Sequence, residues 1–309
     1  MSDLAVALAW HTHPFEELLA LVRSAEALGY RAAYVDGDVS MIDSRGDGDV
    51  LDGWTATAVL LASTRRIEIG SIRLVHHWNA ARLAQAVSTL ERIAPGRLRF
   101  LISIGAYPGD RRFGLPFPPA SDRLDWLDEL LPVLRALWSG AAVSAKSRFF
   151  ELEGARVRPA IARPGGLPIE VGGRGGRLLD VVAAHADRWD VNLPPVAHRV
   201  LDATRRLEAA CRRRGRDPGT IGRSMWLWTR VGAEPAAPEL RAAYRRWNPW
   251  FGEVPEPELA EAIVAGPAEV CRERIATVRS RLRIDLPVLD LAGLDRAGAE
   301  RVMESLAGA

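Results

Sequence analysis

The feature that most constrains the fold of this chain is a repeated alternation of short apolar runs with longer amphipathic runs along its 309 residues. In the longer runs, apolar residues recur at the i, i+3, i+4 and i+7 spacing of one helix face. Repeated βα units build a parallel sheet covered by helices, and eight units favour a closed barrel over an open sheet. Eight can be counted, with strands expected at 4–9, 32–35, 67–74, 98–104, 169–171, 189–191, 225–231 and 286–289.

We therefore predict an α/β fold in which residues 1–309 form a single (β/α)8 TIM barrel with excursions after strands 4 and 7. The first excursion begins with the proline-rich segment 107–119 and includes a small β segment expected at 143–157. The second contains an aromatic stretch at 247–251, Trp-Asn-Pro-Trp-Phe, which we interpret as a lid or an interface patch.

The composition narrows the class of protein. The chain has no uninterrupted apolar run of about 18 residues and no basic region followed by an apolar stretch at its start. We therefore expect neither a membrane span nor a signal peptide, and we predict a cytoplasmic location. The net charge of +2 gives no reason to expect a nucleic-acid partner. Cys211 and Cys271 lack the spacing of paired ligands, so we expect two reduced thiols.

The predicted barrel selects candidate site residues, because barrel active sites lie at the C-terminal ends of the strands. Polar, aromatic or glycine residues follow seven of the expected strands. They are Trp10–His13, Asp36–Asp38, Arg73–Trp78, Ser103–Tyr107, Gly172–Gly176, Asn192 and Thr229–Arg230.

A glycine-rich turn follows the fifth strand, where Gly172, Gly173, Gly175 and Gly176 surround Arg174. Glycines permit a positive φ and a close approach to a ligand. The turn leads into a helix N-terminus, where free N–H groups and the helix dipole favour an anion such as a phosphate. The spacing is not that of the dinucleotide fingerprint, so a Rossmann site is not favoured. A tight βα loop without a ligand is the alternative.

Four histidines lie after the first and third strands: His11, His13, His76 and His77. A metal centre needs three or four converging ligands, commonly with carboxylates or thiols, and no such cluster is visible from the spacing. We expect no metal and interpret these histidines as polar contacts to a substrate or cofactor. No G-x-S-x-G elbow supports a serine hydrolase.

Aromatic residues gather around the predicted strand ends. We expect some of them to wall an apolar pocket for a flat ring or a bulky substrate, the candidates being Trp10, Trp78, Tyr107, Trp226 and Trp228. The last two are spaced i and i+2, so they point to the same face of their strand. Ordinary packing is the alternative, and it is favoured for Trp54 and Trp189.

Several segments, taken in order, resemble one known family over most of the chain. They are V-L-D-G-W-T-A-T-A-V-L-L-A-S-T-R-R-I-E-I-G at 50–70, P-G-R-L-R-F-L-I-S-I-G at 95–105, F-G-L-P-F-P-P with R-L-D-W-L-D-E-L-L-P-V-L-R-A-L-W ending at Trp138, P-I-E-V-G-G-R-G-G with A-D-R-W-D-V-N, and G-P-A-E-V-C-R-E-R-I from Gly266. Each segment alone is a loose match, but their occurrence together in this order is specific. The chain resembles the luciferase-like flavin-dependent oxidoreductases, TIM barrels that use reduced FMN or the deazaflavin coenzyme F420.

This resemblance implies the position of a cofactor. It implies that the turn Gly172–Gly176 holds the cofactor phosphate, and that a β-bulge with a non-prolyl cis peptide in the third strand backs the ring. Ser71-Ile72 is the best match by position, and a small residue before Ile favours F420 over FMN. The remaining positions assigned to the cofactor are Asp36, Gly105 and Ala106.

The chain also departs from the family. An Asp-His pair after the second strand is replaced by Gly37-Asp38, and the G-x-G-x-G after the fourth strand is reduced to S-I-G-A-Y. The barrel loops contain no lysine, so a sugar phosphate is not the expected substrate. Asp36 or Asp38 is a candidate proton donor if burial raises its pKa, and the alternative is that both are solvated loop acids.

The sequence therefore predicts an oxidoreductase in which reduced F420 transfers hydride to an activated C=C, C=N or C=O of a small-molecule, natural-product or peptide-derived substrate. The predicted catalytic set is Asp38, His76, His77, His11 and His13. An FMN-dependent monooxygenase and a non-catalytic cofactor-binding subunit are the alternatives. The resemblance also implies a possible homodimer.

Overall fold

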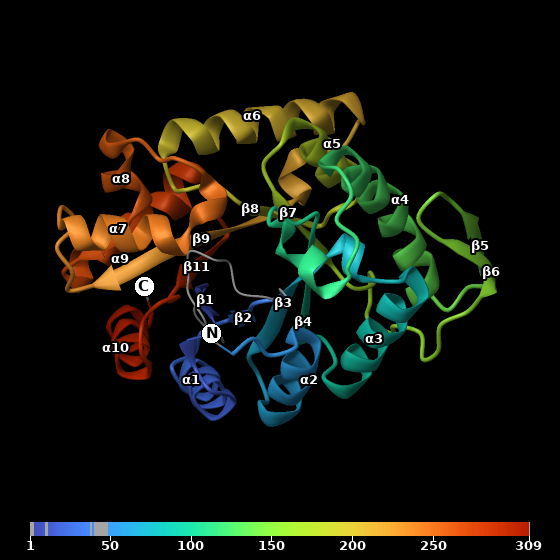
Figure 1. Cartoon of the computed structure of the whole chain (residues 1–309), viewed down its shortest axis with the longest axis horizontal. Helices are drawn as coiled ribbons and strands as arrows, with labels where there is room; N and C mark the ends of the chain where they lie inside the picture. The colour runs from blue at the N-terminus through green and yellow to red at the C-terminus, as the bar shows by residue number, and fades with distance from the viewer. Residues whose placement is uncertain (1–2, 10–11, 38, 40–48, 309) are drawn as a thin grey trace.

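The computed structural model describes residues 3–9, 12–37, 39 and 49–308, and it contains the predicted barrel (Figure 1). Every neighbouring pair of barrel strands is parallel. Pairing of the sixth with the seventh strand closes the sheet. The eight strands are β1 (Ala5–Leu8), β2 (Ala32–Val35), β3 (Glu68–Leu74), β4 (Leu98–Ser103), β7 (Ile169–Gly173), β8 (Arg188–Val191), β9 (Gly222–Val231) and β11 (Leu286–Asp290). The (β/α)8 prediction is confirmed.

Helices between the strands form the outer layer of the barrel (Figure 1). Local side chains define where several of them begin. Asp52 accepts a hydrogen bond from the backbone nitrogen of Thr55, and Asn79 caps the next helix in the same way. The helices are α1 (Phe15–Ala27), α2 (Gly53–Ser63), α3 (Ala80–Ile93), α4 (Ala120–Trp138), α5 (Gly176–His185), α6 (Ala197–Arg213), α9 (Ala268–Leu282) and α10 (Arg296–Leu306).

Both predicted excursions are present. After β4 the chain forms the 3-10 helix η4 (Pro108–Phe113), then α4 and the exposed hairpin of β5 (Val143–Lys146) and β6 (Glu151–Ala155). After β9 it forms α7 (Pro238–Trp247), η6 (Pro249–Phe251), α8 (Glu256–Ala262) and the short strand β10 (Val264–Gly266), which pairs with the end of β9. This second excursion carries an aromatic segment across one end of the barrel.

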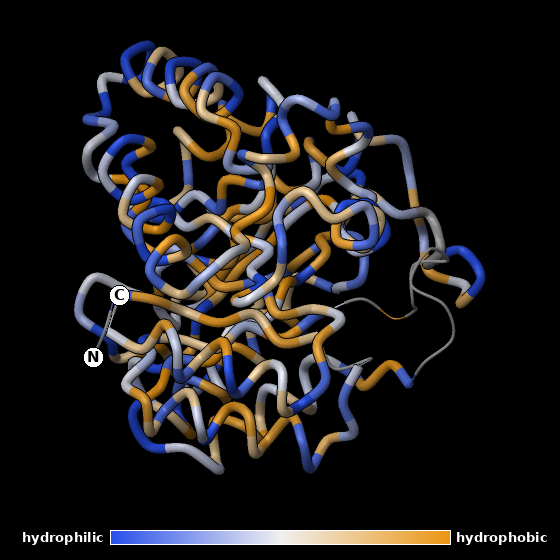
Figure 2. Tube along the Cα trace, turned by 90° about the vertical axis from the view of Figure 1, so that its left-hand side faces the viewer, coloured by the Kyte–Doolittle hydropathy of each residue, from blue (hydrophilic) through white to orange (hydrophobic). Residues whose placement is uncertain are grey.

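The core lies mainly between the sheet and its helices. Figure 2 shows the hydrophobic segments concentrated toward the interior of the molecule. The inside of the barrel holds small and apolar side chains such as Ala5, Ala32 and Val288, together with buried charged groups. No helix among the described residues is long and apolar enough to cross a membrane. Cys211 and Cys271 are buried free thiols.

Candidate active site

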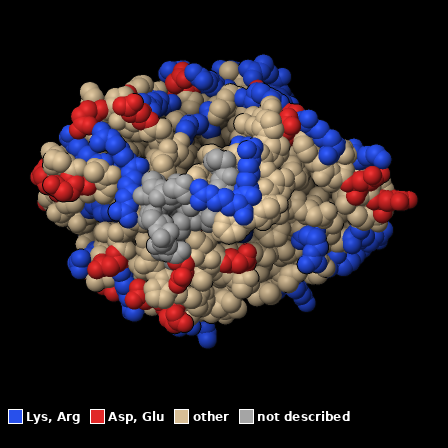
Figure 3. Space-filling view, in the orientation of Figure 1, with Lys and Arg blue, Asp and Glu red and all other residues tan. Residues whose placement is uncertain are grey.

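A cavity of about 430 Å³ opens at the C-terminal ends of the barrel strands. That volume lies within the range of small-molecule sites. Its lining residues come from the ends of the strands, from the loop after β4, from α4 and from η6. The face drawn in Figure 3 is hollowed near its middle, and basic side chains, which are arginines in this region, gather around the hollow. The cavity therefore lies where the barrel architecture places active sites.

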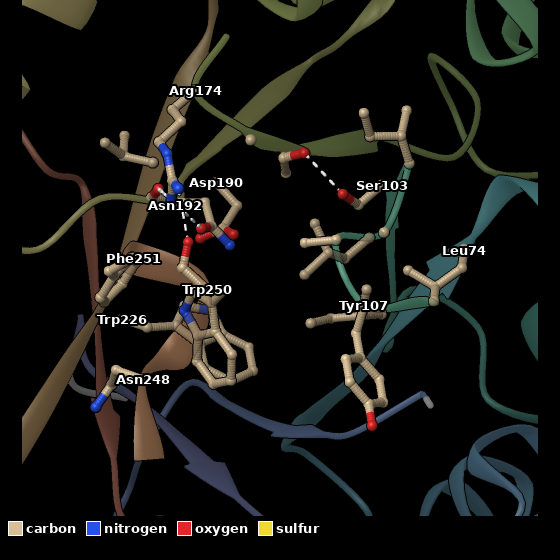
Figure 4. Close-up of a pocket in the computed structure, with 18 of the residues that line it drawn as sticks. Leu74, Ser103, Tyr107, Arg174, Asp190, Asn192, Trp226, Asn248, Trp250 and Phe251 are labelled. Atoms are coloured by element: carbon tan, nitrogen blue, oxygen red, sulfur yellow. Dashed lines mark hydrogen bonds between the residues drawn. The ribbon is translucent and has the colours of Figure 1, made fainter. Parts of the chain in front are cut away.

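Two apolar walls face each other across this cavity. One is formed by Ile72, Leu74 and Leu101, and the other carries Trp226 and Trp250. Figure 4 shows the two tryptophans on the opposite side from Leu74. A gap between aliphatic and aromatic walls suits a flat, largely apolar ring.

The glycine turn forms a third part of the wall. Trp189 donates its indole N–H to the carbonyl of Gly173 over 2.7 Å, and Ser103 donates to the carbonyl of Gly172 over 3.0 Å. Gly173 has a φ of +144°, which L side chains rarely adopt. A Cβ on Gly175 or Gly176 would meet no protein atom within 4 Å, so the space before the first turn of α5 is open. This is the geometry of an anion site at a helix N-terminus.

Arg174 adds a positive charge to the same wall. Its guanidinium donates to the backbone carbonyls of Asn192 and Trp250 over 3.1 and 2.6 Å, and to Asn192 Oδ1 over 3.3 Å. None of these acceptors is a carboxylate, and Arg174 forms no ion pair within the described residues. Burial and the nearby Arg199 lower its pKa. A bound anion would relieve this repulsion, so the turn, the helix and Arg174 together fit a phosphate.

A buried charged network lies deeper in the barrel. Glu170 accepts hydrogen bonds from Arg99 and Tyr34, each over 2.9 Å, and from Ser224 over 2.5 Å. Arg99 also binds Glu68 over 2.9 Å. Burial alone would raise the pKa of Glu170, but Arg99 and the hydrogen bonds from Ser224 and Tyr34 lower it. Glu170 is therefore an ionised carboxylate.

Asp190 connects this network to the cavity. It is 4% exposed and lines the cavity wall, and its Oδ1 lies 3.4 Å from the Ser224 hydroxyl. Burial and the negative charge of Glu170 raise its pKa well above the ordinary range. Figure 4 shows Asp190 beside Asn192 and below Arg174, across the cavity from Ser103.

The structure brings many of the predicted cofactor and pocket residues into this one cavity. They reach it from different strands, as the strand-end rule predicts. Those that line it are Asp36, Ile72, Gly105, Ala106, Tyr107, Gly172, Gly173, Arg174, Gly175 and Trp226. Gly176 does not line the cavity but begins α5 beside it.

The described histidines of the predicted catalytic set do not line the cavity. His13 is buried with its Nδ1 3.4 Å from Glu17. His76 is buried in the 3-10 helix η3 (Val75–His77), where its ring packs edge-on against His77 and Phe117. Their strand ends were identified correctly, but these contacts join the side chains to neighbouring residues outside the cavity lining. No group of three or more His, Cys, Asp or Glu side chains in the described part of the chain could hold a metal ion.

Three other predicted residues also lie outside the cavity lining. Ser71 faces α2, where its hydroxyl lies 3.0 Å from that of Thr57, because strand alternation turns only Ile72 inward. Trp78 packs on Trp54 with ring centroids 5.8 Å apart. Trp228 packs beneath Tyr244. Trp10, His11 and Asp38 lie outside the described residues.

The cis peptide expected at Ser71-Ile72 is not present. The cis bond among the described residues is Arg158-Pro159, so Ser71-Ile72 is trans. No register shift interrupts the pairing of β3 with β4 through Leu74, or with β2 as far as Ser71, so these ladders contain no bulge.

The catalytic and pocket predictions left out several cavity residues. Trp250 and Phe251 line the cavity from the aromatic segment of the second excursion, which supports its interpretation as a lid. Asp190 lies two residues before the strand-end candidate Asn192. The two-residue period of a strand therefore indicated that both side chains share the inner face. Leu74 and Asn248, which fall within the predicted ranges 73–78 and 247–251, also line the cavity, whereas Asp290 was missed.

Comparisons with known proteins agree with this geometry. The family model described as luciferase-like monooxygenase matches residues 3–237. The F420-dependent hydroxymycolic acid dehydrogenase of Mycobacterium tuberculosis is 26% identical over 271 residues, covering 86% of this chain and 73% of that protein. Pyrimidine monooxygenase RutA of Allorhizobium ampelinum is 28% identical over 224 residues, covering 67% of this chain and 58% of that protein. The solved structure of an F420-dependent secondary alcohol dehydrogenase with an F420-acetone adduct has a TM-score of 0.82 over 99% of both chains, at 19% identity. The structural match shows a shared fold.

Proposed function

This chain belongs to the luciferase-like monooxygenase family, and we propose that it is an oxidoreductase that binds reduced coenzyme F420 and reduces an activated C=O, C=C or C=N of a small-molecule or natural-product intermediate. The observation that carries the proposal is the position of Arg174 and the open glycine turn beside a gap between two apolar walls. Arg174 and the glycine turn suit a phosphate, and the gap between the apolar walls suits the ring attached to it.

The fit of this cofactor follows from the residues present. Gly175, Arg174 and the N-terminus of α5 would hold its phosphate, because they combine open space with positive charge. Ile72 and Trp226 would bound its ring on two sides. When bound, the reduced deazaflavin supplies a hydride. The protein positions the substrate, excludes water with the aromatic segment and provides a proton.

The choice of F420 over FMN rests on two relatives. The M. tuberculosis enzyme and the secondary alcohol dehydrogenase are both named as F420-dependent. The likeness to pyrimidine monooxygenase RutA favours a second candidate, an FMN-dependent monooxygenase that activates oxygen. The two candidates differ in their requirement for oxygen. Product formation under strict anaerobic conditions supports the F420 reductase, and an absolute oxygen requirement supports the monooxygenase.

The cavity also narrows the class of substrate. The single lysine of the chain, Lys146, lies on the exposed β5–β6 hairpin and pairs with Glu151 over 2.7 Å. Lys146 does not line the cavity, so we expect no lysine contact to a phosphate of a substrate bound there. The aromatic side chains Tyr107, Trp226 and Trp250 instead favour an apolar or aromatic carbonyl or alkene. A panel of ketones, enones and imines, supplied with reduced F420 under nitrogen, tests this class.

A further inference from the structure

Asp190 occupies a special position in the cavity wall. Its Oδ1 is directed toward Ser224, while its Oδ2 accepts no hydrogen bond from the described residues. A Cβ added to Gly172 would lie only 3.2 Å from Oδ2, so the glycine at this register position leaves room for the carboxyl group. Asp190 therefore presents one oxygen to the cavity and the other to the buried network.

The cations near Asp190 interact with two other carboxylates. Arg99 pairs with Glu170 and Glu68, each over 2.9 Å. Arg188, on the same strand as Asp190, interacts electrostatically with the same two carboxylates. Arg31 also pairs with Glu68 over 3.6 Å, so these guanidinium groups are directed at Glu68 and Glu170. Asp190 itself forms no ion pair within the described residues, which favours the neutral acid.

The remaining groups near Asp190 have opposing or neutral effects on its ionisation. Glu170 on β7 repels an ionised Asp190, whereas Arg99 on β4 and the Ser224 hydroxyl on β9 favour ionisation. Tyr34 on β2 is a neutral phenol that donates its proton to Glu170. Burial and Glu170 prevail over the two opposing influences. This arrangement favours the protonated form of Asp190 beside the Glu170 carboxylate.

We propose that Asp190 is the acid that transfers the proton in this cavity, an assignment that rests on the proposed F420-dependent reduction. Reduction of a carbonyl forms a C–H bond with the hydride and requires a proton at the oxygen. The Asp190 O–H bond breaks as the substrate O–H bond forms, which leaves an Asp190 carboxylate and a neutral alcohol. The carboxylate then regains a proton from solvent through the cavity opening. Alcohol oxidation runs the same transfer in reverse, with the Asp190 carboxylate as base.

Asp36, directly after β2, and Asp290, at the end of β11, also line the cavity, and the contacts of Asp290 suit it less to this role. Asp290 accepts a hydrogen bond from the backbone nitrogen of Ala292 over 2.9 Å, which orients its Oδ1 toward its own loop. A backbone N–H bond stabilises the ionised form of a carboxyl group. Asp290 is therefore arranged as a structural acceptor, in contrast to the open Oδ2 of Asp190.

The first test examines the protonation of Asp190 in the protein without cofactor. Infrared difference spectra of the wild type against Asp190→Asn should show the C=O stretch of one protonated carboxyl group at neutral pH, shifted in D₂O. Asp180→Asn is the matched control, because Asp180 lies on α5 and pairs with Arg213 over 2.6 Å. Its spectrum should retain the signal. A wild-type protein without the signal at neutral pH would have an ionised Asp190, and the proposal would be wrong.

The second test separates cofactor binding from proton transfer. Asp190→Asn should bind F420 with an affinity within about twofold of wild type, and should lower the single-turnover rate by about 10²-fold or more. If the variant binds F420 normally and reacts at the wild-type rate, the proposed role of Asp190 is wrong, while the proposed function still stands. Failure of the wild-type protein to bind F420 would instead overturn the proposed function, and this proposal with it.

Discussion

Trp189 on β8 holds the end of β7 in place, because its indole N–H donates to the carbonyl of Gly173 over 2.7 Å. The bond joins a fully buried side chain to the first half of the glycine turn. The open space before α5 therefore depends on a residue that does not line the cavity. This link between the core and the anion site leads to the first prediction.

Replacing Trp189 with Phe should lower the free energy of unfolding and weaken F420 binding. The lost hydrogen bond leaves the Gly173 carbonyl without this donor, which costs about 1 kcal/mol beyond the effect of the smaller ring. Trp228→Phe is the matched control, since Trp228 is also buried but its indole nitrogen has no hydrogen-bond partner within the described residues. Chemical denaturation of both variants measures the difference. Equal losses of stability would show that the Gly173 bond contributes nothing.

Substitutions in the glycine turn should separate ligand binding from folding. Gly175→Val places its side chain in open space, so it should weaken F420 binding by about tenfold or more while changing stability by less than about 0.5 kcal/mol. Gly173→Val should reduce both quantities, because its Cβ would lie 2.6 Å from Leu178 and its φ is +144°. Titration and thermal denaturation of the two variants check this. Unchanged F420 affinity in Gly175→Val would show that this turn does not bind the cofactor phosphate.

Loss of the Arg174 charge should weaken binding of an anionic cofactor. A charge-assisted hydrogen bond contributes about 1.5–3 kcal/mol, so Arg174→Gln should reduce F420 affinity by about 10- to 100-fold. Arg177→Gln is the control from the first turn of α5, three residues after Arg174, because Arg177 is exposed and pairs with Asp125 over 2.5 Å. Its affinity should stay within about twofold of wild type. Equal effects of the two substitutions would indicate general electrostatics and no specific contact.

The raised pKa of Asp190 makes a prediction about stability and pH. A carboxyl group whose pKa is higher in the folded state contributes stability that is fully present below its unfolded pKa of about 3.9. That contribution is lost as the pH rises toward the folded pKa. Asp190→Asn lacks this pH-dependent contribution. Its free energy of unfolding relative to wild type should therefore increase with pH above about 4. Thermal denaturation from pH 4 to 8 measures this. A constant difference between the two proteins would contradict a raised pKa.

Local sequence patterns were sufficient to predict the barrel. Each strand is a short apolar run between helical runs, so periodicity located all eight strands and both excursions. The strand-end rule also brought Asp36, Gly172 and Tyr107 to one cavity. These predictions succeeded because all the barrel strands run in the same direction. The loops that follow their C-terminal ends therefore meet at one end of the barrel.

Side-chain direction and long-range pairing were harder to predict. The rule placed His76 at the correct end of the barrel but could not show that its ring packs against Phe117. The role of Asp190 depends on its proximity to Glu170 and Ser224, which come from two other strands. A single sequence shows neither contact. The cis peptide at Ser71-Ile72 was inferred from resemblance and is wrong in this structure.

The most direct test of the proposed function is a parallel fluorescence titration of the purified protein with F420 and with FMN under anaerobic conditions. Arg174, the glycine turn and the apolar walls fit the phosphate and ring of either cofactor, and the proposed F420-dependent reduction predicts that F420 binds at least about tenfold more tightly than FMN, equivalent to about 1.4 kcal/mol. Arg174→Gln should reduce that binding in the same assay. Preferential binding of FMN, or binding of neither cofactor, would contradict the account.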